Sequence, residues 1–174
     1  TAGAFTSADT GEARRIESDI TLAYDLLRGR YESIRDALPG MDIQEQRRKW
    51  LLPVLLDLGV NPVYLKSNVE IDGEDKLSFR FSHRGWDDDR APIVNSVPWS
   101  TDFDQRPPKP HRAKSPHDTL QSFLNLSRQS LWSVLTDGGR FRILRDFHQT
   151  ATKGYIEIDL AGILESGDLG DFRA

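Results

Sequence analysis

The chain has 174 residues, of which 37% are apolar and 29% are charged, and its formal net charge is −4. This composition is ordinary for one soluble globular domain that buries one sizeable core. Because the chain has no cysteine, a disulfide framework and a thiolate metal site are both excluded. No apolar run reaches the length of a membrane span, so we expect no membrane partner.

Two further features bear on location and partners. The chain does not begin with Met and carries no signal peptide, so we expect a piece of a longer cytoplasmic protein. A dedicated nucleic-acid binder is usually basic, so the acidic total argues against DNA binding as the sole role.

The N-terminal third is predicted to be helical. Residues 1–10 are small and polar, which predicts a disordered tail. Apolar residues then recur every three or four positions, which predicts a helical extension over 11–40. Asp42 with Glu45 has the pattern of a capping box, so a second helix is predicted from there to about residue 58.

The middle of the chain predicts three strands and a helix. Alternating apolar residues and β-branched residues predict strands at 63–71, 77–81 and 92–99. Ser115 as the N-cap and Pro116 in the first turn predict a helix that ends near residue 128.

The C-terminal part predicts a hairpin, a further strand and a short helix. Strands are expected at about 131–136, 140–146 and 154–159, with a Gly-Gly turn joining the first two and a helix beginning at Leu160. The period of two places Arg140 and Arg142 on the face opposite Phe141 and Ile143. We expect Trp132 and Phe141 to be core anchors, with Leu131 and Ile143 in the same layer.

The predicted helix that begins at Ser115 and the hairpin after it resemble part of a known protein family. Residues 115–146 read SPH…LQ.FLN.S…LW.VLTDG.R.R.LRD, and two shorter matches are FSHR at 81–84 and DQR at 104–106. These patterns resemble large adenine-specific DNA methylases of type IIG restriction-modification and DISARM phage-defence systems. The resemblance covers about residues 46–165 and is firmest at 115–159. It implies the N-terminal module of such a methylase, with S-adenosylmethionine and an NPPY-type motif downstream, and no cofactor in this chain.

The predicted fold class is α+β. The order αβββαβ is that of the restriction-endonuclease-like fold, which the resembled methylases often carry at their N-terminus. Residues 41–165 would form this domain, with an extra N-terminal helix and extra C-terminal strands. Residues 166–174 would begin a linker to a missing downstream domain.

The residues that would make such a domain a nuclease are not where the fold needs them. A carboxylate at the start of the second strand and Glu/Asp-x-Lys in the third would hold Mg²⁺. Neither predicted strand contains a carboxylate, which predicts a non-catalytic domain without a metal. A Mg²⁺ nuclease remains the alternative through two other groups: Glu74 with Lys76 in a hairpin tip, and Asp102 with Asp104, where we expect Asp104 to pair with Arg106.

Local clusters of cations are the candidates for weak, nonspecific contact with double-stranded DNA. They are Arg84, Arg106, Lys109, Arg112, Lys114, Arg140 and Arg142. His83 has two interpretations, contact with phosphate or packing against the basic loop at 106–114. The histidines lack the spacing of zinc ligands.

A third hypothesis is a docking module. The apolar stripe of the first helix needs a partner. That partner would be the downstream methylase domain of the parent chain or another protein of the defence system.

Overall fold

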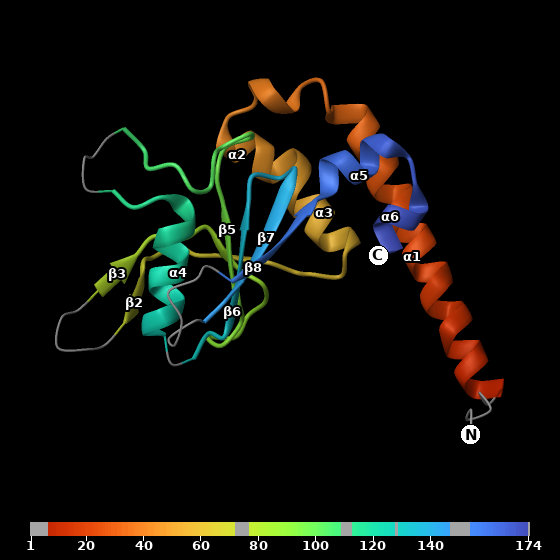
Figure 1. Cartoon of the computed structure of the whole chain (residues 1–174), viewed down its shortest axis with the longest axis horizontal. Coiled ribbons are helices and arrows are strands. Elements are labelled where there is room, and N and C mark those ends of the chain that lie inside the picture. The colour runs from red at the N-terminus through yellow and green to blue at the C-terminus, as the bar shows by residue number, and fades with distance from the viewer. Residues whose placement is uncertain (1–6, 72–76, 109–112, 128, 147–153, 174) are drawn as a thin grey trace.

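The computed structural model describes residues 7–71, 77–108, 113–127, 129–146 and 154–173. The fold is α+β, with a six-stranded mixed sheet between two layers (Figure 1). Helices from both ends of the chain cover one face of the sheet. Helix α4 (Pro116–Leu126) and a small β hairpin cover the other face.

The main sheet has six strands, and the strand predicted at 77–81 is not among them. In spatial order its strands are β1 (Val63–Tyr64), β4 (His83–Arg84), β5 (Ile93–Ser96), β6 (Trp132–Thr136), β7 (Arg140–Arg145) and β8 (Tyr155–Asp159). Strands β5 and β6 are parallel because α4 crosses between them, and the other pairs are antiparallel. The sheet therefore has three strands before α4 and continues with β6 after it.

The strand predicted at 63–71 is divided between two sheets. Its first residues form β1, whereas its last form β2 (Val69–Ile71), which pairs with β3 (Leu77–Phe79) in a separate hairpin. Phe79 packs edge-on against Phe123 of α4, with ring centroids 5.7 Å apart. The hairpin therefore covers α4 instead of extending the main sheet. An alternating pattern of apolar residues alone does not distinguish these two arrangements.

Helix α1 (Ser7–Ile34) begins earlier than predicted, and the 3-10 turn η1 (Leu38–Gly40) follows it. Residues 7–10 are helical, so the prediction of a disordered tail is wrong for them, and residues 1–6 lie outside the described ranges. Tyr24, Leu27 and Tyr31 are buried in the core. The segment 11–40 is therefore part of the domain and not a separate extension, although its N-terminal half projects from the body (Figure 1).

The second predicted helix is present as three consecutive pieces. They are α2 (Ile43–Gln46), the π-helical turn η2 (Arg47–Leu51) and α3 (Leu52–Asp57). Asp42 is the N-cap, and its Oδ1 accepts hydrogen bonds from the backbone N–H of Gln44 at 2.8 Å and of Glu45 at 2.9 Å. Pro53 has no N–H to donate, and the wider π turn immediately before it accommodates the missing bond.

The turn between β6 and β7 anchors this helical segment. Trp50 Nε1 donates to the carbonyl oxygen of Gly138 at 2.7 Å, and Gln46 Nε2 donates to that of Asp137 at 2.5 Å. Gly138 has φ +90°, and a Cβ there would lie 2.9 Å from Cδ1 of Trp50. The turn therefore has a structural role.

Two short helices end the described chain. Helix α5 (Leu160–Ser166) begins where predicted, and α6 (Leu169–Arg173) lies within the segment predicted to begin a linker. Phe172 of α6 packs on Tyr24 of α1 with ring centroids 5.4 Å apart. No helix among the described residues is long and apolar enough to cross a membrane.

The predicted core anchors divide into one that is buried and one that is not. Phe141 is buried in the cluster with α1 and α3, and Ile143 is half-buried, as expected. Trp132 and Leu131 are 45% and 64% exposed, so the prediction for them is wrong. Trp132 is the first residue of β6, and its ring contacts the Arg145 guanidinium 5.4 Å away.

Candidate functional site

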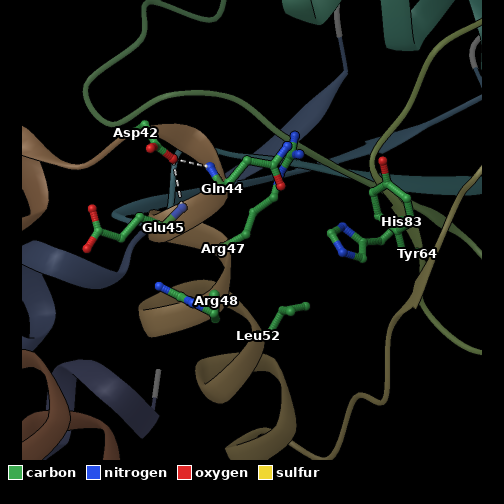
Figure 2. Close-up of a pocket in the computed structure, with 8 residues that line it drawn as sticks. All are labelled: Asp42, Gln44, Glu45, Arg47, Arg48, Leu52, Tyr64 and His83. Carbon is green, nitrogen blue, oxygen red and sulfur yellow. Dashed lines mark hydrogen bonds between the residues drawn. The ribbon is translucent and has the colours of Figure 1, made fainter.

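A pocket of about 590 Å³ lies between the α2–η2 segment and strands β1 and β4 (Figure 2). Its lining residues are Asp42, Gln44, Glu45, Arg47, Arg48, Leu52, Tyr64 and His83. Tyr64 and His83 are register partners on the two strands, and their rings meet edge-on with centroids 5.6 Å apart. The imidazole of His83 extends from β4 toward the helical segment that carries Arg47 (Figure 2).

The side chain of Arg47 is held in place by Ser96 at the end of β5. Its Nε donates to Ser96 Oγ at 2.6 Å, and its Nη2 donates to the Ser96 carbonyl oxygen at 3.2 Å. These bonds engage one edge of the guanidinium. The end that carries Nη1 has no hydrogen-bond partner within the described part of the chain.

A pair of serines fixes Ser96 in turn. Ser96 Oγ donates to Ser82 Oγ at 3.2 Å, and Ser82 Oγ donates to the Val94 carbonyl oxygen at 2.8 Å. Ser82 Oγ also accepts the backbone N–H of Ser96 at 3.0 Å. Both hydroxyls are buried, so the guanidinium of Arg47 is anchored to a rigid part of the sheet.

His83 is the most deeply buried ring at the pocket, with 3% of its surface exposed. Burial lowers the pKa of His83 to about 4, and the positive charge of Arg47 acts in the same direction. The ring is therefore neutral near pH 7. Its buried Nδ1 has no hydrogen-bond partner among the residues that are described. The ring of His83 packs edge-on against that of Tyr64. The loop at 106–114, on which the packing interpretation placed His83, lies partly outside the described residues.

The pocket is lined by two arginines and by two carboxylates that have other partners. Burial lowers the pKa of Arg47, the Tyr64 phenol opposes this, and the charge of Arg80 adds to the lowering. The carboxylate of Asp42 caps α2, and that of Glu45 pairs with Lys49 at 2.5 Å. Within the described ranges no salt bridge to Arg47 is present, so its free donors are available to an oxyanion.

The carboxylates predicted for the nuclease alternative are engaged elsewhere or lie outside the described residues. Asp104 Oδ2 accepts a hydrogen bond from Nη1 of Arg142 at 2.9 Å, and the expected pairing with Arg106 stays a prediction. Asp102 Oδ1 accepts the backbone N–H of Asp104 at 2.9 Å and closes a local turn. Glu74 and Lys76 are not among the described residues. No cluster of three potential metal ligands occurs in the described ranges.

Arg142 is buried and its guanidinium is engaged within the fold, which argues against the predicted DNA contact. Its Nε donates to Glu157 Oε2 at 2.6 Å, and its guanidinium lies 4.0 Å from the centre of the Tyr155 ring. Burial opposes its charge, but the hydrogen bonds to Glu157 and Asp104 outweigh burial and raise its pKa above the ordinary value. Alternation placed Arg142 on the correct face, but α4 and the segment around Asp104 cover that face.

Arg140 is half-buried in the same layer. Its Nη2 donates to Asp137 Oδ2 and to the Thr101 carbonyl oxygen, both at 2.8 Å. Its guanidinium also stacks over Phe103, 4.6 Å from the ring centre. These contacts hold one edge of the guanidinium, so Arg140 braces the loop after β5.

The other predicted cations fall into three groups. Arg84 is half-buried and donates to the carbonyl oxygen of Asp89. Arg106 and Lys114 are exposed and line a second hollow, of about 670 Å³, together with Asn95 of β5. Lys109 and Arg112 lie outside the described residues.

The sequence prediction missed the cations of the pocket. Arg47 and Arg48 are adjacent basic residues in a helix that is otherwise amphipathic, and this was the available signal. The apolar pattern of a helix does not show which strands the helix lies beside in the fold. The contact with Ser96 joins residues 49 positions apart.

Comparisons with known proteins leave the chain without an assigned family. No family model, curated protein or solved structure matches it.

Proposed function

We propose that the chain is a non-catalytic, restriction-endonuclease-like module that engages the phosphate backbone of DNA. Its parent would be a cytoplasmic, S-adenosylmethionine-dependent DNA adenine methylase in phage defence or restriction-modification, as the sequence resemblance implies. The order of helix, three strands, helix and strand supports this fold. The sequences of β4 and β5 contain no carboxylate, which supports the absence of catalysis.

The observation that carries the proposal is the pair of basic surfaces at the end of β5. Consecutive residues of a strand face opposite sides of the sheet. Ser96 holds Arg47 on one side, and Asn95 lines the hollow with Arg106 and Lys114 on the other. Phosphate contacts of this kind position a protein on DNA without reading its sequence.

The nuclease alternative has less support. It needs free carboxylates to bind Mg²⁺. Asp104 is paired with buried Arg142, and Asp102 holds a turn.

The docking alternative is favoured by one feature, an apolar groove of about 670 Å³ between α3 and α5. Leu58, Trp86 and Ile158 lie in its lining and are 43%, 51% and 39% exposed. A methylase domain of the parent chain would be its partner under that alternative.

A salt series tests the proposed DNA contact. We expect weak binding of a short duplex, measured by fluorescence anisotropy, with the logarithm of the affinity falling linearly with the logarithm of the salt concentration. Each neutralised phosphate contributes about −0.9 to the slope. The double variant Arg106→Gln, Lys114→Gln should therefore flatten the slope by about 2 and weaken binding to all sequences alike.

The control removes the same charge from two other exposed arginines. Arg35 and Arg90 line neither basic surface, and their carboxylate neighbours are 3.7 Å away. Their double replacement by Gln should leave the slope nearly unchanged. If the chain binds no duplex even at low salt, the DNA proposal is wrong and the docking module becomes the better account.

A further inference from the structure

The guanidinium of Arg47, beside His83, has donors that no described residue engages. Ser96 fixes one edge of the Arg47 guanidinium, so the orientation of the other donors is set before anything binds. A guanidinium fixed in this way matches the geometry of two oxygens on one phosphate. Arg48 is exposed at the same pocket and adds positive charge.

His83 provides a second observation that points to a ligand. It is 97% buried at the pocket wall (3% exposed), and its Nδ1 lacks a hydrogen-bond partner among the described residues. Most buried polar atoms in proteins have such a partner. A neutral imidazole donates through one ring nitrogen, and a bound oxyanion would also stabilise its protonated form.

We propose that this pocket, defined by Arg47, Arg48, Tyr64 and His83, binds a phosphate group. Arg47 provides paired donors, the exposed Arg48 provides charge at the rim, and His83 provides a donor from the wall. The volume of about 590 Å³ also leaves room for a sugar attached to the phosphate. The identification of the phosphate source with DNA rests on the proposed function, whereas the pocket itself does not.

Inorganic phosphate is the first probe, added to the whole chain at constant ionic strength. We expect the ring signals of His83 in NMR spectra to shift saturably, and the pKa of His83 to rise from about 4 toward its ordinary value of about 6.5. His117 is buried against Arg142 and away from the pocket, so its signals serve as the internal reference. Unmoved His83 signals would overturn the proposal.

Arg47→Gln should weaken phosphate binding about tenfold or more, because a charge-assisted hydrogen bond is lost. Arg35→Gln makes the same change of charge outside the pocket and should bind phosphate like the parent protein. Because Arg47 also holds Ser96, its variant is first checked for an unchanged melting temperature. If it does not fold, Arg48→Gln replaces it, since Arg48 is exposed and has no hydrogen bond to another described side chain. Equal affinity in the folded pocket variant and the parent would contradict the proposal.

A nucleoside monophosphate and a short duplex then distinguish the sources of the phosphate. Shifts of His83 with phosphate and nucleotide, together with no binding of the duplex, would support the pocket and contradict the DNA proposal. Duplex binding while His83 is unmoved by all three probes would support DNA engagement and overturn the pocket. Shifts with all three probes would support both.

Discussion

Replacing Trp50 with alanine is expected to lower the free energy of unfolding by about 4 kcal/mol. Trp50 is fully buried, and its ring lies 5.5 Å from that of Tyr31. The substitution creates a cavity and also removes the donor that satisfies the carbonyl oxygen of Gly138. Because this bond joins η2 to the β6–β7 turn, its loss should loosen the contact between the helical segment and the sheet.

Trp132 gives a matched control of the same residue type. It is 45% exposed, and its ring contacts the guanidinium of Arg145. Trp132→Ala should therefore cost less than about 1 kcal/mol. Urea denaturation of both variants measures the difference. If the two substitutions cost the same, the assignment of buried and exposed tryptophans is wrong.

The second large effect concerns the buried guanidinium of Arg142. Arg142→Ala should cost about 3 kcal/mol, since it removes a buried side chain and its charge-assisted hydrogen bonds to two solvent-accessible carboxylates. These are Glu157, 2.6 Å from Arg142 Nε, and Asp104, 2.9 Å from its Nη1. The Tyr155 ring also loses its stacked partner.

Two controls distinguish this structural role from a role in binding. Arg142→Lys keeps the charge but not the geometry of two carboxylate contacts, so its cost should lie between those of alanine and the parent. Arg90→Ala removes an exposed arginine 3.7 Å from Asp88 and should change stability by less than about 1 kcal/mol. A stable Arg142→Ala protein that has lost DNA affinity would instead restore Arg142 as a DNA contact.

Local sequence patterns were sufficient to predict the helix and strands around the β6–β7 hairpin. Ser115 accepts the N–H of Asp118 at 3.0 Å, as an N-cap signal predicts, and the strands on both sides of Gly138 pair as expected. These features depend on neighbours in sequence. The division of 63–71 into β1 and β2 depends instead on where α4 lies, which no local pattern contains.

The candidate site was harder to predict, because long-range contacts decide which cations are free. Arg142 and Arg47 look alike in sequence, but one faces Asp104 and Glu157 whereas the other faces Ser96 and a neutral His83. The alternation of side chains along β7 predicted correctly on which face of the sheet Arg142 lies. It did not predict that other elements cover that face. An arginine that is buried against carboxylates has a structural role. An arginine that is buried without a carboxylate partner is a candidate binding residue.

One measurement tests most directly the proposal that this domain engages DNA without cleaving it. Supercoiled plasmid is incubated with Mg²⁺ or Mn²⁺ and with enough protein to saturate binding, as judged by anisotropy on the same DNA. The account predicts that the plasmid is bound and remains supercoiled. Metal-dependent nicking that disappears in Glu74→Ala or Asp104→Ala would contradict it and establish the nuclease alternative.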